Sequence, residues 1–230
     1  MIKAVIFDLD GVIADSEPLS AKADDIVLAK HGIHKTQKEK EQSFGRRGEE
    51  IYGDLLRVRK LDIPVTAIIK EKTQVFESLI KGSLKPIRHS LELIGYLKSN
   101  GFRVALATSS HIEKALPELK ELGIEGAFEV TVTGEEVKKG KPDPEIFLKT
   151  AQKLGVKPSE CAVIEDSAFG VTAAKRAGMF TIGFRSPNSR GQDLSRADLA
   201  VSDLSEAIAH FRKEARVNLF FFGPQAQGAP

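Results

Sequence analysis

The chain has 230 residues, and its 34 basic and 32 acidic side chains give a formal net charge of +2. This near-neutral balance gives no reason to expect nucleic acid or an acidic membrane surface as a partner, so an anionic partner would need a local site. The single cysteine excludes an internal disulfide, which fits a cytoplasmic protein, and no apolar run approaches the roughly 20 residues of a membrane helix.

Apolar runs and helical patterns alternate along most of the chain. Continuous apolar runs are typical of strands buried on both faces, and their alternation with helices predicts a parallel sheet with right-handed crossovers. The expected fold class is therefore α/β, with a Rossmann-like, doubly wound parallel sheet. The expected strands are 3–7, 103–107, 129–133, 162–164, 181–184 and 199–201. Helices are expected at 90–99, from 143 onwards and at 171–177.

Residues 15–81 carry only helical signals. A helix is expected to begin at Asp15-Ser16-Glu17-Pro18 and to run to Gly32, with further helices at 36–43, 48–61 and 64–81. A helix-only block after the first strand of a parallel sheet predicts an inserted helical cap subdomain at 15–81. The catalytic core would comprise 1–14 and 82–212. Residues 213–230 would form a C-terminal tail, loose from 216 onwards, whose apolar cluster at 219–222 docks on the core or on another subunit.

Polar residues follow four of the expected strands. They are Asp8 and Asp10 after the first strand, Thr108 after the second, Lys141 after the third, and Glu165 and Asp166 after the fourth. The carboxyl ends of parallel strands share one edge, where ligands bind, so we expect these side chains to converge. Each motif alone has an ordinary explanation as a cap, a turn or a surface pair. Four such motifs directly after buried strands are more simply explained by one site.

These residue types predict phosphoryl transfer. Clustered carboxylates repel one another unless a cation joins them, and Mg²⁺ is the hard cation that suits phosphate chemistry. Lys141 and the metal would neutralise the phosphoryl oxygens, and Thr108 with the backbone N–H groups of the following helix start would donate hydrogen bonds to them. One aspartate can act as the nucleophile and form an aspartyl-phosphate, and a second can act as general acid and then as base.

The motifs resemble those of the haloacid dehalogenase superfamily. The similarity extends from Val5 to about Asp203. Its four motifs are matched by Phe7-Asp8-Leu9-Asp10-Gly11-Val12, by Thr108, by Lys141 and by Val163-Ile164-Glu165-Asp166-Ser167 with Gly170-Val171. The resemblance implies Asp8 as the nucleophile and Asp10 as the acid/base. It also implies a magnesium ion held by Asp8, Asp166 and the Asp10 backbone carbonyl, with Glu165 as a ligand or directly behind the ligands.

Within this superfamily, the helical insert resembles the cap of the β-phosphoglucomutase and small-phosphatase subgroup. Asp10 argues against a dehalogenase, because dehalogenases lack the second aspartate. Ser20 stands where mutases usually have a histidine, and Gly45-Arg46-Arg47-Gly48 departs from their Gly-x-Ser-Arg loop. The sequence therefore favours a phosphatase acting on a small phosphorylated metabolite such as a sugar phosphate. A β-phosphoglucomutase-type phosphomutase is the alternative. A receiver domain of signalling proteins is disfavoured, because there the phosphorylated aspartate follows a middle strand.

Substrate and phosphate binding is expected from Leu9, Ser109, Arg46 and Arg47. The two arginines lie between cap helices, where one would grip a second anionic group on the substrate or both would form an ordinary solvated pair. His89 stands where the family commonly has glycine, and the sequence gives no reason for it. The protein is expected to be a monomer or a weak homo-oligomer.

Overall fold

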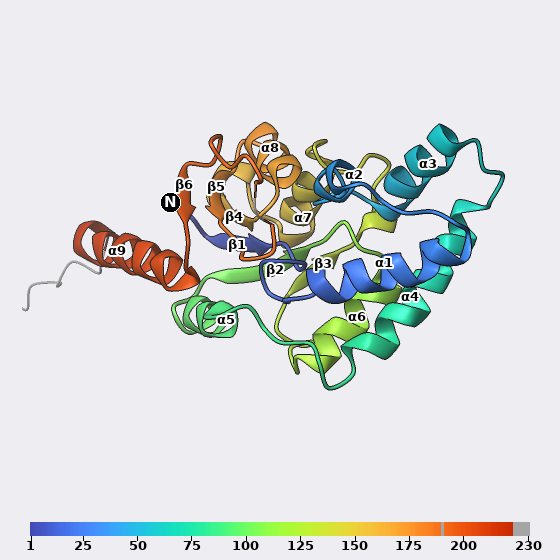
Figure 1. Cartoon of the computed structure of the whole chain (residues 1–230). Helices are drawn as coiled ribbons and strands as arrows, with labels where there is room; N and C mark the ends of the chain where they lie inside the picture. The colour runs from blue at the N-terminus through green and yellow to red at the C-terminus, as the bar shows by residue number, and fades with distance from the viewer. Residues whose placement is uncertain (190, 223–230) are drawn as a thin grey trace, which may run out of the picture.

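The computed structural model describes residues 1–189 and 191–222, and within them the strands form one six-stranded sheet. The strand order is β3-β2-β1-β4-β5-β6, and every neighbouring pair is parallel. The strands are β1 (Ala4–Phe7), β2 (Arg103–Ala107), β3 (Val130–Val132), β4 (Cys161–Glu165), β5 (Phe180–Phe184) and β6 (Leu199–Val201). The predicted α/β fold with a doubly wound parallel sheet is confirmed (Figure 1).

Helices cover both faces of this sheet. On one face lie α5 (Ser90–Ser99), α6 (Ile112–Glu121) and α9 (Leu204–Phe222), and on the other lie α7 (Glu145–Leu154) and α8 (Ala168–Arg176). Two short 3-10 helices, η1 (Gly134–Glu136) and η2 (Pro158–Glu160), precede α7 and β4. None of the helices in the described part of the chain is long and apolar enough to cross a membrane.

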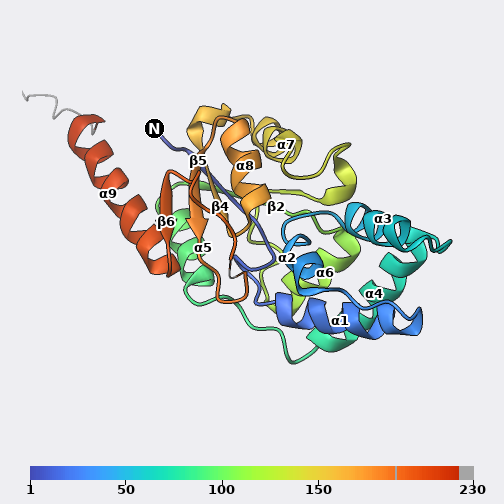
Figure 2. The ribbon, with the colours of Figure 1, turned by 45° about the horizontal axis from the view of Figure 1, so that its top comes forward.

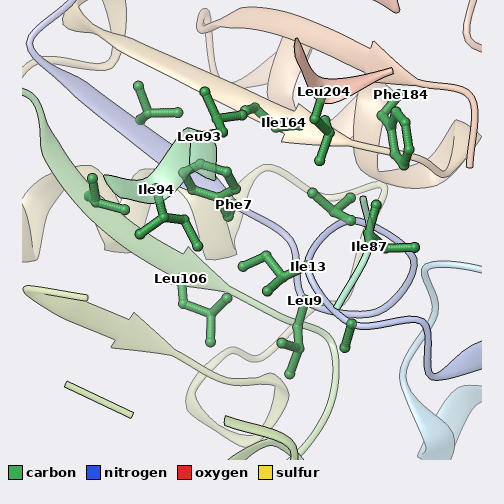
Figure 3. Close-up of a cluster of buried hydrophobic side chains, with 14 of the residues drawn as sticks. Phe7, Leu9, Ile13, Ile87, Leu93, Ile94, Leu106, Ile164, Phe184 and Leu204 are labelled. Carbon is green, nitrogen blue, oxygen red and sulfur yellow. The ribbon is translucent and has the colours of Figure 1, made fainter. Parts of the chain in front are cut away.

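The core follows from the alternation of side chains along each strand. In β1, Val5 and Phe7 pack into the cluster that includes residues of α5 and α9, whereas Ala4 and Ile6 pack with residues of α7 and α8. Figure 3 shows the first cluster, with Phe7 among side chains from neighbouring strands and from α5. Because both faces of β1 are covered, all four of its residues are buried, which explains its continuous apolar sequence.

Four helices follow β1 and lie beside the carboxyl edge of the sheet (Figures 1 and 2). They are α1 (Glu17–Lys30), α2 (Gln37–Glu41), α3 (Gly48–Arg59) and α4 (Val65–Ile80), and we call them the four-helix segment. Val27, Tyr52, Leu55 and Ile68 belong to a small apolar cluster of their own, separate from the two clusters that flank the sheet. The helix positions agree with the sequence prediction to within a few residues.

The C-terminal helix differs from the sequence prediction. Helix α9 continues to Phe222, so the backbone is helical through residue 213, where we expected a tail to begin, and through residue 216, where we expected it to become loose. The reason is local, since residues 213–222 contain neither glycine nor proline. Residues 223–230 and the side chains of the 219–222 cluster lie outside the described part of the structure, so the docking of that cluster stays a prediction.

Candidate functional site

The candidate site lies where the direction of the sheet reverses. Strands β1 and β4 are neighbours at the centre, while the chain continues from β1 towards β2 and from β4 towards β5 on opposite sides. A crevice forms outside the carboxyl ends of strands at such a switch point. Asp8 directly follows β1, Glu165 is the last residue of β4, and Asp166 follows it. The topology therefore brings together two of the predicted acidic motifs.

Lys141 joins the two motifs. Its Nζ donates to Asp8 Oδ1 at 2.7 Å and to Glu165 Oε1 at 2.6 Å. The lysine side chain is only 1% exposed. Burial alone would lower the pKa of Lys141, but the charges of Asp8 and Glu165 outweigh burial and raise it above its ordinary value. Lys141 is therefore a fixed positive charge that holds one oxygen of Asp8 in place.

Asp8, Glu165 and Asp166 form a carboxylate cluster. One oxygen from each lies within 4.8 Å of the others, and all three residues are buried. Burial raises the pKa of Asp8 to about 7 despite the Lys141 ammonium, and burial together with Glu165 and Asp8 raises the pKa of Asp166 well above its ordinary value. When all three carboxyl groups are ionised, the single ammonium of Lys141 leaves two negative charges uncompensated. This donor set fits a hard divalent cation with oxygen ligands.

The three carboxylates are not equivalent. Asp8 and Asp166 line the cavity described below, whereas Glu165 does not and is fully buried. Glu165 Oε2 accepts hydrogen bonds from the Ser167 N–H at 3.0 Å and the Ser167 hydroxyl at 2.9 Å, and its other oxygen accepts from Lys141. Both Glu165 oxygens are thus engaged by the protein. Glu165 supports Lys141 and the start of α8 from behind the cavity wall.

Gly11 allows the first motif to approach Asp166. Its φ is +76°, in the left-handed region that favours glycine. A Cβ atom at this position would lie 2.2 Å from Asp166 Oδ2. Both the backbone conformation and the space therefore require glycine here.

The Asp10 carboxylate is separate from this cluster. Its Oδ1 accepts from the Ser16 hydroxyl at 2.5 Å and from Lys114 Nζ at 2.6 Å, and its Oδ2 accepts from the Ser110 hydroxyl at 2.8 Å. Burial acts to raise the pKa of Asp10, but the charge of Lys114 and these hydrogen bonds outweigh it and lower the pKa to about 2. The Asp10 backbone carbonyl, and not its side chain, is left for the metal role that the resemblance implies.

The predicted phosphate-binding residues lie at the same edge. Thr108 is buried at the end of β2, its hydroxyl accepts from the Ser110 N–H at 3.1 Å, and it lines the cavity together with Ser109. The Ser109 hydroxyl donates to the Gly45 carbonyl at 2.9 Å, so it also contacts the four-helix segment. The side chain of Leu9 is buried in the core, which leaves only its backbone for contact with a ligand.

A cavity of about 170 Å³ separates this edge from helices α1, α3 and α4. Arg46 lines it and pairs with Asp54 at 2.7 Å. Arg47 does not line it. Arg47 Nη1 donates to the Val137 carbonyl at 3.0 Å and its Nε donates to Glu50 at 2.9 Å, so this side chain ties the four-helix segment to the loop that precedes Lys141. The structure thus brings Arg46, and not Arg47, to the cavity.

A second group of charged side chains, which we call the helical ionic cluster, forms the cavity wall away from the sheet. Asp24 pairs with Lys35 at 2.6 Å and with Lys72 at 3.1 Å, and it accepts a hydrogen bond of 2.5 Å from the Tyr52 hydroxyl. Burial acts to raise the pKa of Asp24, but the two lysines and the hydrogen bonds lower it to about 2. Ser20 lines the same cavity.

Sequence reasoning missed several residues that surround the site. Ser110 is among them, although its place in the Thr-Ser-Ser run after the second strand was a usable signal. Lys114 and Glu118 gave no such signal, because their i, i+4 spacing is that of an ordinary surface pair on a helix. His89 lies away from the cavity. It adopts φ +62° and its Nδ1 lies 2.6 Å from Asp203 Oδ1, so it joins the starts of α5 and α9.

Comparisons with known proteins agree with this architecture. The chain is 39% identical over 182 residues to a phosphorylated carbohydrates phosphatase of Thermotoga maritima, covering 77% of this chain and 82% of the relative. It is 34% identical over 220 residues to a β-phosphoglucomutase of Bacillus subtilis, covering 91% and 94% respectively. A crystal structure of β-phosphoglucomutase from Clostridium difficile superposes with a TM-score of 0.82 at 28% identity, covering 96% of this chain and 99% of that one.

The fold and the carboxylate cluster define a Rossmann-like α/β protein with an acidic centre at the switch point of its sheet. Residues 5–184 match the haloacid dehalogenase-like hydrolases. The chain belongs to this family, which confirms the resemblance found in its motifs.

Proposed function

We propose that the protein is a magnesium-dependent phosphatase that hydrolyses a small phosphorylated carbohydrate through an aspartyl-phosphate on Asp8. The observation that carries this proposal is the position of Asp8, which lines the cavity, contacts Lys141 at 2.7 Å and lies within the carboxylate cluster. A carboxylate held in this way is an oriented nucleophile.

The two aspartates of the first motif have separate roles in the reaction, Asp8 as the nucleophile and Asp10 as the acid and base. A carboxylate oxygen of Asp8 attacks phosphorus, the bond from phosphorus to the leaving oxygen breaks, and Asp10 donates a proton to that oxygen. Because its contacts lower the pKa of Asp10 to about 2, Asp10 gains this proton only when the anionic substrate binds beside it and raises that pKa. In the second half, Asp10 accepts a proton from water as the water attacks the phosphorus of the aspartyl-phosphate. Inorganic phosphate leaves and Asp8 is restored. Lys141 and the Thr108 hydroxyl stabilise the phosphoryl oxygens during both transfers.

The metal would be held by Asp8, Asp166 and the Asp10 backbone carbonyl, with Glu165 behind them. When bound, Mg²⁺ supplies positive charge that offsets the phosphoryl group and the clustered carboxylates. The support for this assignment is the carboxylate cluster itself, in which three carboxylates share one ammonium and burial raises the pKa values of Asp8 and Asp166.

The small volume and polar lining of the cavity favour a small, hydroxyl-rich substrate. We assign residues 15–81 as the cap that closes over the catalytic core at 1–14 and 82–212. Polar groups of this cap, among them Tyr52, Lys72 and Ser20, line the cavity opposite Asp8 and suit hydrogen bonding to a sugar. Arg46 is the side chain best placed to meet a second anionic group, while Arg47 holds the cap against the core.

The proposal is tested by measuring phosphate release from a panel of sugar and small-metabolite monophosphates with Mg²⁺. We expect turnover that requires the metal and that Asp8→Asn abolishes, because the amide retains the shape of the nucleophile without its charge. Asp62→Asn, at an exposed position in a loop between α3 and α4, is the matched control and should retain full activity. Turnover that persists in Asp8→Asn would exclude an aspartyl-phosphate at this residue.

A phosphomutase is the second candidate, since similarity to a β-phosphoglucomutase covers 91% of the chain. Ser20 at the cavity wall favours hydrolysis, because mutases of this subgroup usually carry a histidine there. Isomerisation of β-glucose 1-phosphate that requires a sugar bisphosphate activator, with no release of phosphate from any compound of the panel, would establish the mutase instead.

A further inference from the structure

Lys114 reaches the first motif from a different element, helix α6. Its Nζ donates to Asp10 Oδ1 at 2.6 Å and to the Ser110 hydroxyl at 3.1 Å. The side chain is only 14% exposed, because it lies beneath helix α4 with its ammonium 4.7 Å from the centre of the Phe76 ring. Because neighbouring side chains enclose it between α6 and Asp10, the Lys114 side chain has few other orientations available.

A buried glutamate gives Lys114 a second counter-ion. Glu118, one turn further along α6, is fully buried, and its Oε1 accepts from Lys114 Nζ at 2.8 Å. Its other oxygen, Oε2, is buried with no hydrogen-bond partner among the described residues. Lys114 is thus shared between a carboxylate in the cavity and one behind it.

We propose that Lys114, backed by Glu118, is a positioning residue that fixes the orientation of the Asp10 carboxylate for proton transfer to the leaving oxygen. The inference rests on the proposed function, since it assigns how the acid/base of that reaction is held. Ser16 and Ser110 also donate to Asp10, so Lys114 is one of three contacts, but it is the only one of these that carries charge.

This role predicts a dependence on the leaving group. A sugar alkoxide must receive a proton as its bond to phosphorus breaks, whereas a nitrophenolate leaves without one. A misplaced Asp10 therefore slows hydrolysis of a sugar phosphate and leaves p-nitrophenyl phosphate nearly unaffected. The value of kcat/KM is the appropriate measure, because it covers only the steps up to the first irreversible phosphoryl transfer.

The test compares the two substrates in Lys114→Met, which keeps the apolar stem beside Phe76. We expect kcat/KM for the sugar phosphate to fall about 10- to 100-fold, less than the roughly 100- to 10,000-fold range of general acid catalysis, because Ser16 and Ser110 remain. For p-nitrophenyl phosphate we expect a change below about threefold. Lys120→Met, an exposed lysine on the same helix, should change neither value.

Two further variants keep the inference falsifiable. Lys114→Met with Glu118→Gln removes both charges, so a folding defect caused by an unpaired buried glutamate is avoided, and it should show the same difference between substrates. In an Asp10→Asn background, Lys114→Met should cause no additional loss, because a positioning residue acts through the group it positions. Equal losses on both substrates, or no loss on either, would overturn the inference. Absence of wild-type turnover would instead overturn the proposed function and this inference with it.

Discussion

Two ionic clusters contribute side chains to the same cavity, and they are built differently. At the sheet edge, Asp8, Glu165 and Asp166 share a single ammonium, that of Lys141. In the helical ionic cluster the ratio is reversed, since one carboxylate, Asp24, holds two lysines and accepts from a tyrosine. The first cluster is incomplete without an added cation. The second carries one ammonium in excess and needs no added cation.

We infer that this difference separates a site for chemistry from a site for substrate recognition. Burial raises the pKa of Asp8 to about 7 despite Lys141, whereas two lysines outweigh burial at Asp24 and lower its pKa to about 2. A cluster of carboxylates that lacks a counter-charge suits a divalent cation. A cluster that is already paired presents fixed polar groups to a substrate, at no cost in reorganisation.

The largest effect is expected from removing the shared ammonium at the sheet edge. Lys141→Met leaves Asp8 and Glu165 buried without their partner, so we expect the free energy of unfolding to fall by about 3–5 kcal/mol in the absence of metal. Urea denaturation measures this change. Lys139→Met, two residues away and exposed, should stay within about 0.5 kcal/mol of wild type. A loss below 1 kcal/mol for Lys141→Met would mean that the cluster relaxes by protonation instead.

The next largest effect is expected from adding the missing cation. Mg²⁺ at about 100 times its Kd should raise the free energy of unfolding by about 2.7 kcal/mol. Asp166→Asn should remove most of this gain, whereas Asp24→Asn should retain it, because only the sheet-edge cluster lacks a positive partner. Asp193→Asn, an exposed acid, is the control. An Mg²⁺ response that survives Asp166→Asn would place the metal elsewhere.

A smaller and pH-dependent effect is expected in the helical ionic cluster. The pKa of Asp24 is lowered from 3.8 to about 2, so its stabilising contribution is present above pH 3.8 and is lost as the pH falls towards 2. Asp24→Asn should therefore reduce the free energy of unfolding by about 2 kcal/mol at pH 7, and the difference from wild type should shrink below pH 4. Asp25→Asn changes the adjacent aspartate, which is 58% exposed, and should have little effect at any pH. A difference that grows on acidification would contradict this account.

The smallest effect is expected at the contact between His89 and Asp203, which is partly exposed and outside both clusters. His89→Gly loses the contact with Asp203 but relieves a left-handed backbone, so the net change should stay within about 1 kcal/mol. His89→Ala loses the contact and keeps the strain, so it should be less stable than His89→Gly by about 1 kcal/mol. Thermal unfolding of the two variants side by side provides the measurement. Equal stabilities would indicate that the backbone at this position is not strained.

The sheet and its acidic edge were predictable because they depend on short-range signals. A strand buried on both faces, such as β1, has a continuous apolar sequence, and the position of Asp8 directly after it predicts the edge on which it lies. The contacts of Lys114 were not predictable, since its partner Asp10 lies 104 residues away and the pattern on α6 is that of a surface helix. Likewise, adjacent residues leave the backbone in different directions, so no local pattern distinguishes Arg46 from Arg47.

The Gly45 loop limits how closely the four-helix segment can approach the sheet. Its backbone has φ +72°, and a Cβ atom there would lie 2.2 Å from the hydroxyl of Ser167, the residue that donates two hydrogen bonds to Glu165. The loop thus rests on the residue that supports the carboxylate cluster. For protein engineering, position 45 therefore offers a way to change the distance between the helices and the sheet. Gly45→Ala would push this loop away from Ser167 and weaken the hydrogen bond from the Ser109 hydroxyl to the carbonyl of residue 45, so a single methyl group would widen the gap between the helices and the sheet.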